Sequence, residues 1–255
     1  MILHSKIFGK GITILVLHGL FGNGDNWTSF AEKFSKYYEI HLLDIRNHGN
    51  SFHSEKMNYD IISEDILEYI CYYKLDHPIL LGHSMGGRAV MKFSMKYPLI
   101  PKKIIIVDIS PNAYKNTENE NIICALKNVD FHCIKTRNDL VLFLKKWILD
   151  KKIRSFFSKC TYRNKNGKLS FRFFLTGIEK NYKSLIQEDI KGGVYNGPTL
   201  FLRGEYSNYL LPKEYDSIIK LFPKSIFVTI KKSNHWIHID NPLSFYEEVD
   251  FFLKK

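Results

Sequence analysis

Continuous apolar runs separated by amphipathic stretches organise the chain. Six short runs lack the alternation of a half-buried strand: residues 11–17, 40–45, 78–81, 103–108, 198–202 and 225–230. Such runs are typical of strands buried on both faces of a parallel sheet. Helical spacing follows in several of the intervening stretches, at 60–75, 86–97, 211–222 and from Asn241-Pro242 onward. This alternation predicts an α/β fold with a mostly parallel central sheet flanked by helices.

The stretch from 111 to 196 interrupts the alternation. Helical spacing covers 120–128, 139–149 and 151–159, and the Asn166-Gly167 pair that follows indicates a hairpin turn. We interpret this stretch as a mainly helical cap inserted between two strands. The expected division is therefore a core of residues 1–110 and 197–255 with a cap at 111–196, which together suit one large domain.

Composition narrows the class of protein. Of 255 residues, 45% are hydrophobic and 15% aromatic, which favours a folded chain over a disordered one. No apolar run reaches the roughly 18 residues of a membrane-spanning helix, and the first residues do not resemble a secretory signal. The four cysteines form no C-x-x-C pair. Reduced thiols and a cytoplasmic location are expected.

The net charge of +11, from 37 Lys and Arg against 26 Asp and Glu, raises the hypothesis of nucleic-acid binding. The basic residues nevertheless occur singly or in pairs such as Lys145-Lys146 and Lys231-Lys232, without a nucleic-acid motif. We interpret them as a solvated surface and expect no nucleic-acid partner. At most, the charge would help to draw in an anionic substrate such as an acyl-CoA.

A nucleophile motif lies between a predicted strand and a predicted helix. Gly82-His83-Ser84-Met85-Gly86 fits G-x-S-x-G, in which the serine occupies a sharp strained turn and the small flanking residues let strand and helix approach. The N-terminal end of the helix directs its positive dipole at the serine. Ser84 is therefore the candidate nucleophile, and His83 beside it is expected to pack.

An oxyanion-binding loop follows the first strong strand at His18-Gly19-Leu20-Phe21-Gly22. In such an arrangement one backbone N–H of this loop acts with the N–H of the residue after the nucleophile, here Met85. Leu20 is the first candidate for the loop donor and Phe21 the second. We expect His18 to hold the loop in shape rather than to act as a base.

The candidate base is His235, because it follows the last predicted strand, where the chain order Ser…Asp…His places a catalytic histidine. Asn234 before it is expected to adopt the left-handed conformation that such a turn can require. His238 is expected to line the site. His235 and His238 lack a third ligand at suitable spacing, so we expect no metal, and no cofactor motif is evident.

The acid position departs from the common pattern. The turn after the next-to-last strand usually carries the carboxylate, but here it reads Gly204-Glu205-Tyr206-Ser207. Asp108 ends a neighbouring buried strand, where a carboxylate needs a partner such as histidine. We therefore predict Asp108 as the acid, keep Glu205 as the alternative, and expect Ser207 to hydrogen-bond near the histidine.

Together these motifs resemble the α/β-hydrolase superfamily and, more narrowly, YbfF-type bacterial esterases. The resemblance rests on five segments: 18–22, 44–51 (Asp-Ile-Arg-Asn-His-Gly-Asn-Ser), 82–87, 108–111 and 235–238. It implies an α/β-hydrolase fold with a helical cap and a small carboxylesterase acting on short acyl esters, with thioesters as an alternative. In that group an aspartate after the sixth strand serves as the acid and a serine occupies the usual acid turn. The cap resembles the family least.

The predicted function is a serine esterase that forms an acyl-enzyme on Ser84, with a small-molecule acyl ester or thioester as its substrate. Two alternatives stay open at this point. One is carbon–carbon bond hydrolysis or a lyase reaction on the same fold, and the other is a catalytically silent binding protein. The sequence does not predict the acyl length, the physiological substrate or the oligomeric state.

Overall fold

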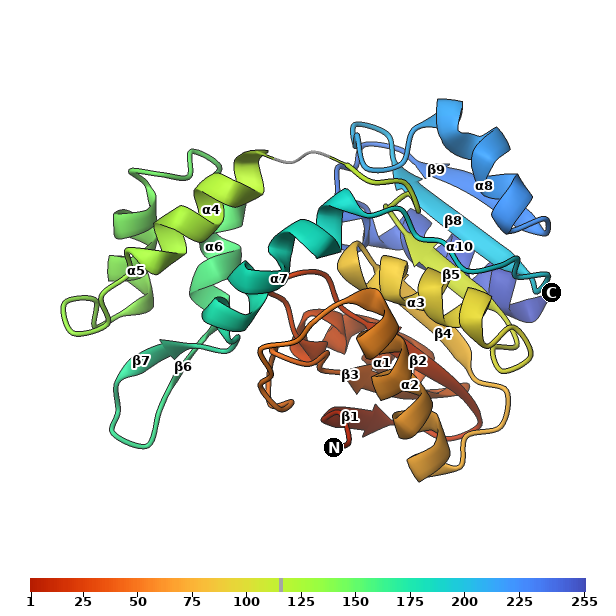
Figure 1. Ribbon diagram of the computed structural model, residues 1–255, viewed down its shortest axis with the longest axis horizontal. Helices are drawn as coiled ribbons and strands as arrows, with labels where there is room; N and C mark the ends of the chain where they lie inside the picture. Colours follow the sequence, from red (N-terminus) through yellow and green to blue (C-terminus); the bar gives the residue numbers. More distant parts are fainter. Residues whose placement is uncertain (115–116) are drawn as a thin grey trace.

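A seven-stranded sheet forms the centre of the molecule in the computed structural model, which describes residues 1–114 and 117–255 (Figure 1). The strand order is β1-β3-β2-β4-β5-β8-β9, and all neighbours are parallel except β1, which is antiparallel to β3. The sheet strands are β1 (Ser5–Phe8), β2 (Ile12–Leu17), β3 (Tyr38–Leu43), β4 (Ile79–His83), β5 (Ile104–Val107), β8 (Thr199–Gly204) and β9 (Ser225–Ile230). The predicted α/β fold with a mostly parallel sheet is confirmed. The edge strand β1 was not predicted.

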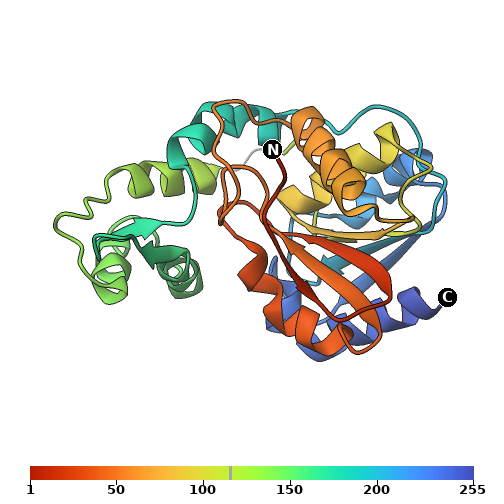
Figure 2. The same ribbon diagram turned by 90° about the horizontal axis from the view of Figure 1, so that it is seen from below.

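Helices cover both faces of the sheet, as the edge-on view shows (Figure 2). Successive residues of β2 contribute to different cores: Ile14 and Val16 pack with one helix layer, Leu15 and Leu17 with the other. This division explains the continuous apolar runs, because both faces of each central strand are buried. The flanking helices are α1 (Thr28–Phe34), α2 (Tyr59–Tyr73), α3 (Met85–Lys96), α8 (Tyr215–Leu221), α9 (Ile237–Asp240) and α10 (Pro242–Lys254), with the short 3-10 helices η1 (Gly24–Trp27) and η2 (Pro212–Glu214).

Four helices and a hairpin lie between β5 and β8 and project from one end of the sheet (Figure 1). They are α4 (Thr117–Lys127), α5 (Arg137–Leu144), α6 (Lys151–Lys159), the hairpin β6 (Thr161–Arg163) and β7 (Leu169–Phe171), and α7 (Leu175–Gln187). The hairpin turns at Asn166-Gly167, and Gly167 has a φ of 72°. We retain residues 111–196 as the proposed extent of the cap. Helix α7 was not predicted from the sequence.

The two chain segments that connect the cap with the core run beside each other. Tyr114 N–H donates to the Ile186 carbonyl at 3.0 Å, and Ile190 N–H donates to the Pro111 carbonyl at 2.8 Å. Arg88 of α3 is fully buried beneath them and donates to the carbonyls of Asn112 (2.6 Å) and Glu188. The chain therefore leaves the core and returns to it through one hydrogen-bonded neck.

Among the residues described, no helix combines the length and the apolar character that crossing a bilayer requires.

Candidate active site

Ser84 occupies the sharp turn between β4 and α3. Its backbone has φ 53° and ψ −117°, a strained conformation for a residue with a side chain, and its surface is 8% exposed. The flanking glycines make the turn possible by close approach. A Cβ on Gly86 would lie 2.3 Å from the Leu17 carbonyl oxygen, and one on Gly82 would lie 2.3 Å from that of Gly86. The local structure is therefore the strand–turn–helix elbow that the motif predicts.

Asp108 follows β5 directly and has no solvent exposure. Its Oδ1 accepts the Gly204 N–H at 2.7 Å, and its Oδ2 accepts both His235 Nδ1–H at 2.8 Å and the Ser207 hydroxyl. A buried carboxylate requires such donors because it has lost its hydration. The structure thus brings Asp108, His235 and Ser207 together, as the positional reasoning expected.

Glu205 lies in the same turn as Ser207 but is directed elsewhere. Its side chain is exposed, and its Oε2 accepts the backbone N–H of Lys232 at 2.8 Å. Within the parts of the chain that the structure describes, no hydrogen bond joins Glu205 to His235. The geometry therefore favours Asp108 over Glu205 as the partner of the histidine.

The loop between β9 and α9 positions His235 through contacts on two sides. His83 Nε2–H donates to the His235 carbonyl at 2.9 Å, and the Tyr209 ring stacks on the imidazole with centroids 3.9 Å apart. Sequence reasoning assigned His83 to packing alone and missed Tyr209, which lies two residues beyond Ser207. Burial lowers the pKa of His83 well below its usual range, so this histidine is a neutral donor.

One expectation about this loop was wrong. The residue with positive φ is Lys232, at 54°, rather than Asn234. The chain reverses at Lys232 immediately after β9, so Asn234 needs no left-handed conformation and its N–H donates to Asp240 Oδ2 at 2.9 Å. His238 packs beneath the site, where its ring stacks on Trp27 at 4.2 Å.

Ser84 and His235 are not hydrogen-bonded to each other in the described part of the chain. Their elements are nevertheless held together, since His83 precedes the serine and bonds the His235 backbone. Hydrogen bonds between a nucleophile and its base are often long without substrate and shorten when it binds. The imidazole side chain is 24% exposed, so its second nitrogen can reach a ligand.

The loop after β2 passes directly over the nucleophile. A Cβ on Gly19 would lie 3.4 Å from the Ser84 Cβ. Among described residues, the N–H groups of Leu20 and Met85 have no hydrogen-bond partner, so both are available to a ligand. Phe21 was the second candidate for the oxyanion donor, and the structure does not support it. Its N–H donates to His48 Nε2 at 3.1 Å and is therefore not free for an oxyanion.

Two neutral histidines fix the shape of this loop. His18 Nε2 accepts the Ile45 N–H at 3.1 Å, while His48 accepts from Phe21 and donates from Nδ1 to the Arg46 carbonyl at 2.9 Å. Burial lowers the pKa of His18 to about 4, and burial together with neighbouring His18 lowers that of His48 to about 3. His18 thus has the structural role expected of it. His48 was missed, although it lies in the segment 44–51 that carries the resemblance.

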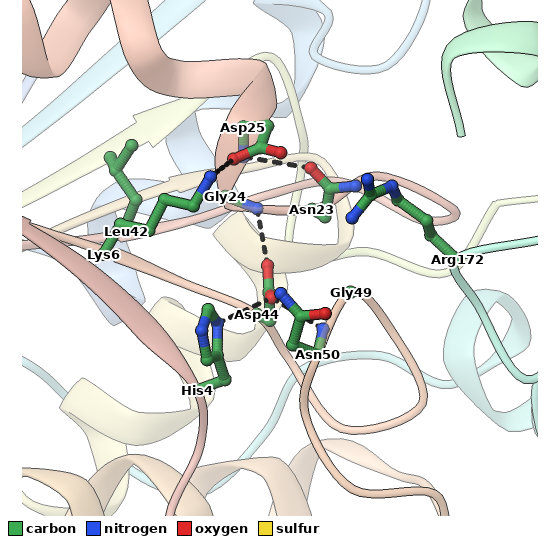
Figure 3. A pocket seen from close by; sticks show the side chains of 10 residues that line it. All are labelled: His4, Lys6, Asn23, Gly24, Asp25, Leu42, Asp44, Gly49, Asn50 and Arg172. Carbon is green, nitrogen blue, oxygen red and sulfur yellow. Dashed lines mark hydrogen bonds and ion pairs between the residues drawn. The ribbon is translucent and has the colours of Figure 1, made fainter. Parts of the chain in front are cut away.

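Asp44 extends this support to the outer end of the loop (Figure 3). Its Oδ1 accepts the Gly24 N–H at 2.7 Å, and its Oδ2 accepts the Asn50 N–H at 2.8 Å and contacts His4 Nδ1 at 3.0 Å. The small pocket around it is lined by core residues and by Arg172 from the cap. Its side-chain bonds tie the loop after β2 to the loop after β3.

Helix α6 of the cap packs against both loops of the site. Phe157 lies against Phe21 with ring centroids 5.4 Å apart, and Phe156 lies against Trp236 at the same separation. The cap therefore touches the oxyanion loop and the histidine loop through aromatic side chains.

Comparisons with known proteins agree with this architecture. Residues 12–129 match the family model described as alpha/beta hydrolase fold. The chain is 36% identical over 242 residues to a "Putative esterase/lipase" of Haemophilus influenzae, covering 95% of this chain and 83% of that protein. It is 30% identical over 253 residues to a Danio rerio protein named sn-1-specific diacylglycerol lipase ABHD11, covering 96% and 80%.

A solved structure titled "Marine microorganism esterase" superposes with a TM-score of 0.95 at 34% identity, covering 98% of this chain and 99% of that one. The resemblance to YbfF-type esterases is confirmed by 26% identity over 229 residues to Esterase YbfF of Escherichia coli, across 90% of this chain and 88% of that protein. The chain belongs to the α/β-hydrolase fold family, and within it to the carboxylesterase-like serine hydrolases.

Proposed function

We propose that the chain hydrolyses short-chain carboxylic esters through an acyl-enzyme on Ser84, with His235 as the base and Asp108 as the acid. One observation carries the assignment. A fully buried carboxylate hydrogen-bonds the histidine whose loop is fixed to the nucleophile elbow. This is the arrangement in which a carboxylate holds the imidazole in the tautomer that can accept a proton at Nε2.

The reaction proceeds in two steps. His235 Nε2 takes the hydroxyl proton as Ser84 Oγ attacks the ester carbonyl carbon, and the N–H groups of Leu20 and Met85 hold the oxyanion that forms. Protonated His235 then gives its proton to the leaving alcohol oxygen, and the acyl group stays on Ser84. Water attacks this acyl-enzyme with His235 again as the base, which releases the acid and restores the serine.

Ser207 acts through Asp108 in this proposal. Its hydroxyl donates to the same Oδ2 that His235 contacts, and its own N–H is fixed on the Gly204 carbonyl at 3.1 Å. The serine therefore replaces the carboxylate that commonly occupies this turn and positions the one that has moved to the end of β5. Thioesters would enter the same mechanism with a thiol as the leaving group.

Two measurements test the proposal. Fluorophosphonate labelling should modify the folded protein and should disappear in Ser84→Ala, which retains the remainder of the site. A panel of nitrophenyl esters of increasing acyl length should show turnover that is highest for short chains. A folded protein that is not labelled would support the silent binding alternative, and labelling without ester turnover would support carbon–carbon bond cleavage.

A further inference from the structure

The excess positive charge is concentrated in one part of the cap. Residues 137–171, from the first residue of α5 to the last of β7, contain ten of the 37 Lys and Arg residues but only two of the 26 Asp and Glu residues. This segment, called the cap tip below, has a net charge of +8 in a protein whose total is +11. The basic residues are therefore less evenly distributed than their single and paired occurrence along the sequence suggests.

Most of these cations have no carboxylate partner within the described residues. Six exposed lysines of the cap tip form no ion pair with any described carboxylate: Lys145, Lys146, Lys151, Lys159, Lys165 and Lys168. Elsewhere, Lys92 and Lys96 of α3 are paired with acidic residues of α2. Uncompensated positive charge raises the energy of the isolated surface and favours a negatively charged partner.

Large apolar side chains are exposed among these lysines. Leu142 is 59% exposed, Trp147 44% and Leu149 91%, and all three lie at the end of α5 or in the turn that follows. Trp147 contrasts with Trp27, which is 2% exposed in the core. Tryptophan and leucine next to lysine form the composition of segments that lie in the interface of a bilayer.

The cap tip also has a suitable location. Helix α5 and the β6–β7 hairpin lie at the end of the molecule farthest from the sheet, as both views show (Figures 1 and 2). An open hollow of about 390 Å³ beside the β6–β7 hairpin is lined by Arg137, Arg163 and Tyr162, among others. Helix α6 connects this surface to the site, because its Phe156 and Phe157 contact the loops around Ser84.

We propose that the cap tip docks the protein on the surface of an anionic lipid bilayer. The lysines contact lipid phosphates while Trp147 and the two exposed leucines enter the interfacial layer. The exposed apolar side chains favour a bilayer over nucleic acid, since a phosphate backbone would leave them in water. Docking does not depend on ester hydrolysis, so it can be measured separately.

The test is co-sedimentation with vesicles of phosphatidylcholine alone or with roughly 30% phosphatidylglycerol. Binding to the anionic vesicles should exceed binding to the neutral ones and should decrease as salt is added. Each lysine near an anionic surface strengthens binding about fivefold, so the Lys145→Gln/Lys146→Gln variant should bind about 25-fold more weakly. The tryptophan fluorescence of the protein should shift to shorter wavelength on binding, and this shift should be absent in the Trp147→Phe variant.

The matched control is Lys213→Gln/Lys220→Gln, which removes two exposed lysines near α8 on the opposite side of the molecule. This variant should bind within about twofold of the unaltered protein. Circular dichroism and ester turnover establish that all variants are folded. Equal loss in both double variants, no preference for anionic vesicles, or tighter binding to a DNA duplex than to vesicles would overturn the proposal.

Discussion

Replacing Asp108 by Asn tests the assignment of the acid with little change in side-chain shape. In the structure, Asp108 Oδ1 accepts the Gly204 N–H and Oδ2 faces His235 Nδ1. An asparagine keeps its single carbonyl oxygen on Gly204, so its NH₂ group must face His235. That NH₂ group can only donate, which forces Nδ1 to be the acceptor and puts the ring proton on Nε2. The imidazole then presents a proton, instead of a lone pair, to Ser84.

The expected loss of activity is large because His235 is in the wrong tautomer in every turnover. A change of this kind lowers kcat by on the order of 10⁴ in a serine hydrolase, which corresponds to about 5.4 kcal/mol of transition-state stabilisation. The matched comparison is Glu205→Gln. Glu205 is exposed, and the partners that the structure describes for it are the Lys232 N–H and the Tyr206 side chain rather than His235, so this variant should lose less than about threefold.

The assay is kcat/KM for one nitrophenyl ester, measured beside thermal unfolding of each variant so that a folding defect is recognised. Ser207→Ala provides an intermediate case, because it removes one donor from Asp108 but leaves the charge. It should lower kcat by roughly tenfold to a hundredfold. If Asp108→Asn stayed within tenfold of the unaltered protein while Glu205→Gln became inactive, the acid would be Glu205.

Three further predictions follow from other contacts. Gly19→Ala should lower kcat by roughly tenfold to a hundredfold with little change in unfolding temperature, because its Cβ would lie 2.9 Å from His83 Nδ1 and displace the oxyanion loop; unchanged kcat would refute this. The free energy of unfolding should fall as the pH drops below about 6.5, by up to about 1.4 kcal/mol per pH unit for each of His18 and His48. The reason is that the unfolded chain binds a proton on each histidine near pH 6.5, whereas the folded protein binds it only near the lowered pKa, about 4 for His18 and about 3 for His48. Urea unfolding at pH 7 and pH 5 measures this loss of stability, and equal stability at the two pH values would contradict the prediction. Arg88→Met should lower the free energy of unfolding by about 3 kcal/mol, since the neck carbonyls lose their donor, and a variant that unfolds at the same urea concentration would show that they find another partner.

The elements predicted from the sequence are those with strong local signals. Strand β2 is a continuous apolar run because both of its faces are buried, and the glycines around Ser84 are required by close contacts. Strand β1 was missed because it pairs on one side only and leaves Ile7 46% exposed, so it lacks such a run. Helix α7 was missed although its buried Ile178, Tyr182, Leu185 and Ile186 follow helical spacing, because its N-cap residue, Phe174, provides no side-chain cap that would mark its start.

The site was predictable to the level of side-chain chemistry but not of backbone hydrogen bonds. Asp108 could be predicted from the sequence because a carboxylate at the end of a buried strand needs hydrogen-bond donors. The role of His48 depends on the φ of 63° at Phe21, which turns that N–H toward the imidazole. The conformation of Lys232 likewise depends on how the chain leaves β9. The local amino-acid sequence predicts neither backbone conformation, because both depend on tertiary contacts.

The neck formed by residues 110–114 and 186–190 brings the two ends of the cap insertion together. Since the two segments bond each other through Tyr114, Ile186, Pro111 and Ile190, the entry and exit points of the insertion coincide. The register of β5 with β8 is set within the sheet and does not depend on what the neck carries. A different insertion spliced at this point would keep this register but would have to replace the packing of Phe157 on Phe21 and of Phe156 on Trp236. A redesigned cap would therefore have to supply two aromatic contacts, one to each loop beside Ser84.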